Sequence, residues 1–268
     1  MMPRCNGSGI RERVGTNGLM RTRYQDGPGG LHGQSSVDSR KRLAAACLAD
    51  EAVCPVAFAA CYVYSPRGRG AIAAGSRVLR ARLKSGDPDW LARYAARVRR
   101  LAAGSGPYAG FFGPDVVLVP VPRSRPIVPG AVWTAERLAV ELARLGLAGS
   151  VWSALYRCVP VRKSATSLAG DRPTVAEHYR SLAAGEPLDS CGSDHPVSPG
   201  RLLLVDDVVT KGRTLLAAAV RLRELYPATE VRAFALARTM GFVRGIEHLV
   251  TPCEGTIWWN GDDARRQP

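Results

Sequence analysis

The sequence predicts an α/β protein, a doubly wound parallel sheet with helices on both faces. Apolar runs at residues 116–121, 202–205 and 230–237 have the length and character of strands buried on both faces of a parallel sheet. Apolar residues recur at helical spacing between these runs, which predicts helices at residues 71–84, 89–103, 131–145 and 215–226. Together these patterns favour a single wound sheet over an all-helical or all-strand protein.

The chain of 268 residues is long enough for one domain with a sizeable core and a tail. Residues 1–40 mix Gly, Arg, Asn and Ser without apolar periodicity, which predicts a basic, disordered N-terminal tail. The domain over residues 41–268 divides into three parts: a strand and helices at 41–110 that could form a hood, a core at 115–240, and a C-terminal extension at 241–268. Within the first part we expect a helix at 40–50 and a strand at 53–64. A further strand is expected at 151–156, followed by a long loop at 157–199.

A formal net charge of +14 favours anionic partners, either phosphorylated small molecules or nucleic acid. The basic stretches do not alternate with aromatic residues, so only non-specific contact with nucleic acid is expected. The seven cysteines contain no Cys-x-x-Cys pair, which indicates reduced thiols rather than a disulfide frame or a zinc site. No apolar run is long enough to cross a bilayer, so we expect a cytoplasmic protein without membrane contact.

Residues 201–215 combine a buried strand, two carboxylates, a turn and a helix start. Asp206 and Asp207 follow the strand, and the turn at 210–214 leads into the helix. A helix N-terminus leaves backbone N–H groups unpaired, so a turn with Gly and hydroxyls there suits a phosphate. Carboxylates instead accept hydrogen bonds from neutral hydroxyls. Because a ribose 5-phosphate offers both groups, the segment predicts a sugar-phosphate site.

The run Val-Asp-Asp-Val-Val-Thr-Lys-Gly-Arg-Thr-Leu at residues 205–215 resembles the signature of type I phosphoribosyltransferases, which binds 5-phosphoribosyl 1-diphosphate (PRPP). The resemblance implies the sheet of that family, with Asp206 and Asp207 as catalytic acids on the ribose hydroxyls. It also implies Mg²⁺ bound with PRPP and held by these acids indirectly, through PRPP hydroxyls or water. The implied PRPP-binding residues are Asp206, Asp207, Val209, Thr210, Lys211, Gly212, Arg213 and Thr214.

Two further segments resemble ComF-like phosphoribosyltransferases. The strand at 116–121 ends in Pro-Val-Pro, and on the resemblance the loop after it, with Arg123, Ser124 and Arg125, receives the diphosphate. The segment at 157–199 resembles the loop that closes over PRPP, which makes Lys163 a catalytic cation facing the diphosphate. Leu83-Lys84-Ser85-Gly86 resembles an upstream element of the same proteins. Supporting residues on these segments are Arg157, Arg162 and Arg172, whereas His178 and His195 are weak candidates.

The resemblance, closest to the ComF-like and amidophosphoribosyltransferase-like branches, implies a glycosyltransferase of nucleotide metabolism. Such an enzyme moves 5-phosphoribosyl from PRPP to a nitrogen acceptor, a nucleobase or ammonia, and releases diphosphate. Two alternatives remain open: a PRPP-binding regulator without turnover, and a ComF-like accessory protein of DNA uptake. The acceptor is not identified, and a homodimer is left open. Trp258 and Trp259 are expected to pack against the domain rather than to stack on an acceptor base.

Overall fold

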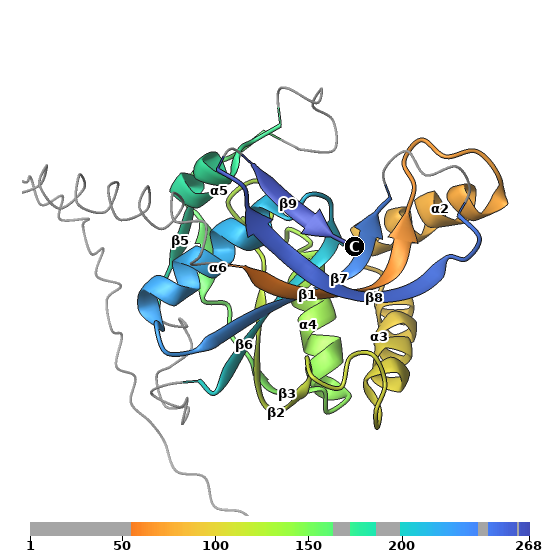
Figure 1. Cartoon of the computed structure of the whole chain (residues 1–268), viewed down its shortest axis with the longest axis horizontal. Coiled ribbons are helices and arrows are strands. Elements are labelled where there is room, and N and C mark those ends of the chain that lie inside the picture. The colour runs from red at the N-terminus through yellow and green to blue at the C-terminus, as the bar shows by residue number, and fades with distance from the viewer. Residues whose placement is uncertain (1–54, 163–171, 186–198, 241–245, 262) are drawn as a thin grey trace, which may run out of the picture. The chain divides into compact units, whose positions relative to one another are not determined.

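The computed structural model describes residues 55–162, 172–185, 199–240, 246–261 and 263–268. Within them a seven-stranded sheet runs in the order β3-β2-β6-β7-β1-β8-β9 (Figure 1). Its strands are β1 (Val56–Tyr64), β2 (Gly113–Pro120), β3 (Ala148–Val151), β6 (Arg201–Val209), β7 (Glu230–Thr239), β8 (Val250–Trp259) and β9 (Ala264–Gln267). From β3 to β1 the strands are parallel, whereas β8 is antiparallel to β1, and β9 to β8. The α/β class is confirmed, and the predicted parallel sheet carries an antiparallel hairpin from the C-terminal extension.

Helices cover both faces of the sheet (Figure 1). One face packs against α2 (Ala71–Ser85), α3 (Pro88–Ala102) and α4 (Thr134–Arg144), and the other against α5 (Val175–Ser181) and α6 (Arg213–Leu225). A hydrophobic core lies on each face of the sheet, and alternate residues of β6 point into one core or the other. Leu203 packs with the first group of helices, and Leu202 and Leu204 pack with the second. Each core is therefore a layer of helix against sheet, and β6 lies between the two layers.

Local sequence signals fix several helix ends. The Asp87 side chain accepts hydrogen bonds from the backbone N–H groups of Asp89 and Trp90, which caps α3, and Pro88 occupies its first turn. Gly86 ends α2 in the left-handed conformation with φ 66°. Thr174 and Glu177 form a capping box at the start of α5, in which each side chain satisfies a backbone donor of the other residue.

The structure differs from the sequence prediction in three places. The strand expected at 151–156 is two strands, β3 and β4 (Leu155–Arg157), and β4 pairs with β5 (Leu182–Ala184) in a separate two-stranded sheet. The expected long loop at 157–199 therefore contains α5 and β5. Strand β6 continues to Val209, so the acidic pair lies inside the strand rather than after it.

The predicted tail at 1–40 and helix at 40–50 lie outside the described residues, as do the first two residues of the strand expected at 53–64. Among the described residues, no helix combines the length and the apolar character that a membrane crossing requires.

Candidate phosphate and ribose site

The site lies at the carboxyl end of β6, a central strand between β2 and β7. Residues 202–205 of β6 are at most 1% exposed, and Val205 pairs with Pro120 on one side and Phe234 on the other. The strand forms hydrogen bonds with a neighbouring strand on each edge and is packed against side chains on both faces. The residues that follow it therefore start from a fixed position. Ligands of open α/β sheets bind beyond the carboxyl ends of the strands, where this segment emerges.

The turn after β6 ends at a glycine that begins α6 without a side-chain cap. Gly212 has φ 87°, a left-handed value that favours glycine, and it immediately precedes α6. No side chain caps the N-terminus of α6, and Leu216 N–H donates to the Gly212 carbonyl 2.8 Å away to begin the helix. The first N–H groups of a helix have no acceptor within the helix, and its N-terminus carries the positive end of the dipole, so this end of α6 suits an anionic ligand.

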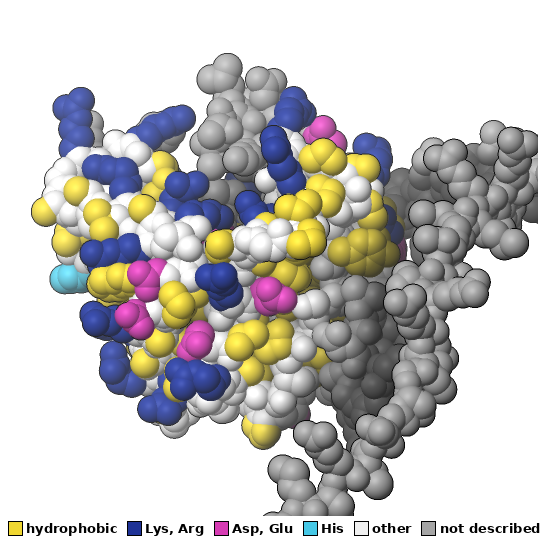
Figure 2. Space-filling model, turned by 180° about the vertical axis from the view of Figure 1, so that it is seen from behind, with side chains coloured by type: hydrophobic (Ala, Val, Ile, Leu, Met, Phe, Trp, Pro, Cys, Tyr) yellow, Lys and Arg dark blue, Asp and Glu magenta, His cyan; other side chains and the backbone are white. Residues whose placement is uncertain are grey.

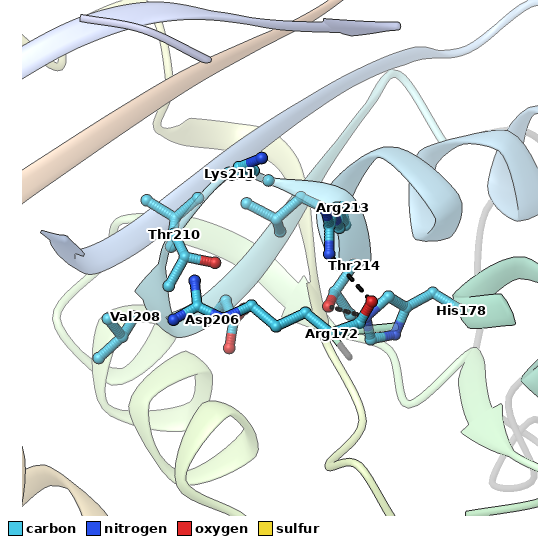
Figure 3. A pocket seen from close by; sticks show the side chains of 11 residues that line it. Arg172, His178, Asp206, Val208, Thr210, Lys211, Arg213 and Thr214 are labelled. Carbon is cyan, nitrogen blue, oxygen red and sulfur yellow. Dashed lines mark hydrogen bonds between the residues drawn. The ribbon is translucent and has the colours of Figure 1, made fainter. Parts of the chain in front are cut away.

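A small pocket of about 30 Å³ lies at this turn. Its lining comprises the turn and helix start at residues 208–215 together with Asp206, Arg172 and His178. Figure 3 shows Arg172 extending toward Asp206 and Thr210, with Thr214 and His178 beside one another. The predicted turn thus contributes to a cavity that also has a carboxylate, two hydroxyls and a guanidinium on its wall.

The two acids of the signature do not share this cavity. Asp206 lines the pocket, whereas Asp207 is not among its lining residues. Asp207 is only 7% exposed and forms an ion pair with Lys84, at the end of α2. Adjacent residues of a strand point to opposite faces, which explains why one acid meets the pocket and the other meets α2. The structure therefore brings Lys84, from the element that resembles ComF-like proteins, to the acidic pair.

Asp206 has an unusual electrostatic environment. Loss of hydration raises the pKa of its carboxyl well above the ordinary range, the charge of Asp207 raises it further, and Lys84 lowers it. Asp206 Oδ1 accepts a hydrogen bond of 2.8 Å from the backbone N–H of Asp207, which fixes its orientation. A carboxyl group with a raised pKa in a pocket is a physical indication of a functional residue.

Lys211 and Arg213 do not direct their charges freely into the pocket. Asp263, in the turn between β8 and β9, accepts hydrogen bonds of 2.7 Å from both Lys211 Nζ and Arg213 Nη2. Arg213 Nη1 also donates to the Arg172 and Pro173 carbonyls, at 3.2 and 3.0 Å. These cations, predicted to contact PRPP, hold the C-terminal hairpin and the segment before α5 against the turn. Thr210 and Thr214 keep their side chains at the pocket (Figure 3).

Arg172 and His178 complete the pocket from α5 and the residues before it. His178 is 4% exposed, and its Nε2 lies 3.4 Å from Thr214 Oγ1. Burial lowers the pKa of His178 to about 4, and the charges of Arg157 and Arg213 act in the same direction, so the ring is neutral near pH 7. Arg172 Nε and His178 Nδ1 are buried and have no hydrogen-bond partner among the described residues. Arg172 Nε–H is a donor, and His178 Nδ1 is a donor or an acceptor according to the tautomer, so a ligand could form a hydrogen bond with each.

The predicted diphosphate loop starts at the same edge of the sheet but lies outside the pocket. Val121 N–H donates to the Val205 carbonyl, so the loop leaves β2 directly beside Asp206. Arg123 and Arg125 are exposed and Ser124 is half-buried. Arg157, which is buried, donates from Nε to the Arg123 carbonyl at 3.0 Å and thereby holds the loop in place.

Only part of the segment at 157–199, which is expected to close over PRPP, lies within the described residues. Lys163, the expected catalytic cation, lies outside the described residues. Arg162 is exposed and forms an ion pair of 3.2 Å with Glu177 of α5. His195 also lies outside the described residues. Trp258 and Trp259 belong to β8, and Trp259 packs against the buried cluster on the α6 face.

The sequence gives no signal for Asp263, and the structure places His178, a weak candidate in the sequence, in the wall of the pocket. Asp263 is about fifty residues from the cations it binds, and no spacing rule connects it to them. The capping box before His178 was a usable signal, because it predicts a helix that would place the ring at a fixed point. Among the described residues, no group of three or more His, Cys, Asp or Glu side chains could hold a metal ion.

Comparison with known proteins adds no family to this geometry: no protein-family model matches the chain, and no curated protein matches it.

Proposed function

We propose that this protein is a type I phosphoribosyltransferase, which transfers 5-phosphoribosyl from PRPP to a nitrogen acceptor and releases diphosphate. One observation carries the proposal: the uncapped N-terminus of α6 and the Asp206 carboxylate line one pocket at the carboxyl end of β6. The phosphate and the hydroxyls of a single sugar phosphate would both find partners there. The helices on both faces of a mostly parallel sheet agree with the fold that this family implies.

In the proposed complex, the 5-phosphate binds at the turn. Its oxygens accept hydrogen bonds from the N–H groups of the first turn of α6 and from the hydroxyls of Thr210 and Thr214. Arg172, which also lines the pocket, supplies positive charge. The neutral His178 ring contacts Thr214 and closes the pocket on its inner side.

Asp206 accepts hydrogen bonds from the ribose hydroxyls and faces the sugar as positive charge develops on its ring. The loop with Arg123, Ser124 and Arg125 receives the departing diphosphate. Asp206 would hold Mg²⁺ only indirectly, through the PRPP hydroxyls or water, and the cation would supply positive charge to the diphosphate. Asp207 does not contact the sugar in this arrangement, because Lys84 binds it on the α2 side.

A second candidate is a PRPP-responsive binding protein without turnover. Three side chains of the signature form ion pairs within the protein, which favours this candidate because they are then not directed at a substrate. Asp207 pairs with Lys84, and Lys211 and Arg213 pair with Asp263. The accessory role in DNA uptake has less support. On the face in Figure 2, Lys and Arg side chains are scattered among other residues rather than gathered into one stripe.

Calorimetry with Mg²⁺ and PRPP, paired with an assay of diphosphate release, tests the proposal. The wild type should bind PRPP, and Asp206→Asn should bind it at least tenfold more weakly, because one of the two oxygens that accept hydrogen bonds from the ribose hydroxyls becomes an NH₂ donor. Asp115→Asn is the matched control: it removes a carboxylate on β2 that pairs with Arg201 and does not line the pocket, and PRPP affinity should not change.

Release of diphosphate with ammonia or a nucleobase would support the enzyme. Binding without release across that panel would support the regulator. Absence of PRPP binding to the wild-type protein would contradict both.

A further inference from the structure

A second group of cations lies at the carboxyl edge of the sheet, outside the pocket lined by the turn at 210–214. We name this turn the phosphate turn, after its role in the proposed function. Arg238, near the end of β7, is only 7% exposed. Its Nη1 contacts the Met240 sulfur at 2.7 Å, and its Nε is buried without a hydrogen-bond partner. No carboxylate among the described residues pairs with Arg238. A thioether is a weak acceptor, so the guanidinium lacks the anionic partner that a buried charge requires.

Arg266 approaches the same place from β9. Its Nε donates to the Thr210 carbonyl and its Nη2 to the Thr239 carbonyl, each at 2.8 Å. Its Nη1 is buried and lacks a hydrogen-bond partner among the described residues. Arg266 lies close to Arg238, because the Thr239 carbonyl that it binds directly follows Arg238 in the chain. Burial lowers the pKa of Arg266, and the charge of Arg238 acts in the same direction. Carbonyls satisfy some of the N–H groups but neutralise no charge.

The strand register places this group beside the candidate site. Arg238 pairs with Val209 of β6, immediately before the phosphate turn, and with Val63 of β1 on its other side. Arg266 reaches Thr210, the first residue of that turn. Arg238 and Arg266 do not line the pocket of the turn. The group therefore lies next to that pocket, at the edge where α/β proteins bind their ligands.

We propose that Arg238 and Arg266 form a second anion site, which binds the carboxylate of the acceptor. A guanidinium presents parallel N–H groups that match the two oxygens of a carboxylate. This inference rests on the proposed function and narrows it: the acceptor is a small nitrogen compound that carries a carboxylate, not a neutral nucleobase or ammonia. When an acid binds, its carboxylate pairs with the two cations beside the ribose pocket. When the neutral analogue binds, the buried N–H groups of these cations stay without acceptors, so the acid should bind more tightly.

Matched pairs of small compounds test the site. Calorimetry should compare nicotinate with nicotinamide and orotate with uracil, and inorganic phosphate should be titrated separately. The proposal predicts that at least one acid binds ten times or more tightly than its neutral partner. Arg238→Met and Arg266→Met should each abolish that preference. Arg232→Met, on β7 but paired with Glu230, is the matched control and should retain it.

Stability separates a ligand site from a structural role for Arg238. If the buried cation awaits a ligand, Arg238→Met removes an unpaired charge, and the melting temperature of the free protein should stay the same or rise. A lower melting temperature with unchanged binding of the acid would show that Arg238 only supports the fold, and would overturn the proposal. Equal affinity for acids and neutral partners, or a preference for phosphate over every acid at this site, would also overturn it.

PRPP binding in the same preparations distinguishes the two proposals. Wild-type protein that binds PRPP but shows no preference for acids contradicts this inference and leaves the transferase intact. Acid binding that depends on Arg238, without any PRPP binding, contradicts the transferase and confirms the anion site alone.

Discussion

At the residue scale, Asp263 determines how the phosphate turn presents its charge. Its carboxylate, with a side chain 15% exposed, holds the heads of both Lys211 and Arg213. Its own backbone N–H donates to Asn260 Oδ1 at 2.8 Å, so the hairpin turn fixes the carboxylate. An anion in the pocket would consequently meet N–H groups and hydroxyls first, because these two cations already have a partner.

Asp263→Asn should lower the free energy of unfolding at pH 7 by about 1–2 kcal/mol, an amount reduced for solvent screening. Loss of hydration opposes the change, but the bonds from Arg213 and Lys211 dominate and lower the pKa of Asp263 from 3.8 to about 2. A carboxylate with a lower pKa in the folded state stabilises the fold above its unfolded pKa. The difference between wild type and variant should therefore persist down to about pH 4 and disappear as the pH falls through about 2.

Urea unfolding at a series of pH values measures this difference. Glu254→Gln, which removes an exposed carboxylate from β8, is the control and should follow the wild-type curve. A gap between wild type and Asp263→Asn that stays constant from pH 7 to pH 2 would show that the ion pairs do not stabilise the fold.

The sequence located the turn at 210–214 but not its partners. Thr210, Gly212 and Thr214 lie together because they are close in the chain, and a strand, a turn and a helix start are local patterns. Asp263 and Arg266 reach the same turn from the C-terminal hairpin, and their charges look like those of ordinary surface residues in the sequence. Lys163 stays a prediction.

At the element scale, the β8–β9 hairpin supports the phosphate turn through shape as well as charge. A Cβ on Gly212 would lie 2.6 Å from Ile257 Cγ2 of β8, a distance too short for two carbons. The turn and the hairpin are therefore in close contact at Gly212. Glycine is favoured there for two reasons: its φ is 87°, and there is no room for a side chain.

Gly212→Ala should destabilise the protein by about 2–4 kcal/mol, of which about 1 comes from the left-handed backbone and the rest from crowding. Gly146→Ala is the matched control, because Gly146 has φ 76° with no atom within 4 Å of its added Cβ, and it should cost only about 1 kcal/mol. Thermal or denaturant unfolding measures both variants.

Removing the contact should relieve the crowding. In an Ile257→Ala background, Gly212→Ala should cost about 1 kcal/mol, as Gly146→Ala does. If the cost of Gly212→Ala is the same in both backgrounds, Ile257 does not restrict the turn.

The hairpin itself was not predicted, for a physical reason. Of the residues in β8, only Ile257 is buried, so the strand lacks the continuous apolar run that identified β2, β6 and β7. Its role depends on pairing with β1 rather than on its own composition. Segments 157–199 and 151–156 were misjudged similarly, because β4 and β5 have three residues each and are stabilised by pairing with each other.

At the scale of the whole molecule, the alternation of apolar runs and amphipathic segments was sufficient to predict the sheet and its two helical layers. Parallel strands are covered by helices on both faces, so almost all of their residues are apolar. A strand-length apolar run therefore indicates this fold class from composition alone. The same arrangement places the ends of β2, β6 and β7 at one edge, where Asp206, the loop at 123–125 and Arg238 all lie. The account of function depends on that edge, and above all on one claim: the pocket binds a phosphorylated pentose, with Asp206 on its hydroxyls.

Calorimetry with ribose 5-phosphate and 2-deoxyribose 5-phosphate tests this claim most directly. The two ligands share the phosphate, but only the ribose compound has the 2-hydroxyl, which would donate a hydrogen bond to Asp206. Wild-type protein should bind the ribose compound about tenfold or more tightly, since a hydrogen bond to a carboxylate contributes about 1.5–3 kcal/mol. In Asp206→Ala the two affinities should become equal while the phosphate still binds. Equal affinities in the wild type, or an undiminished preference in Asp206→Ala, would contradict the account.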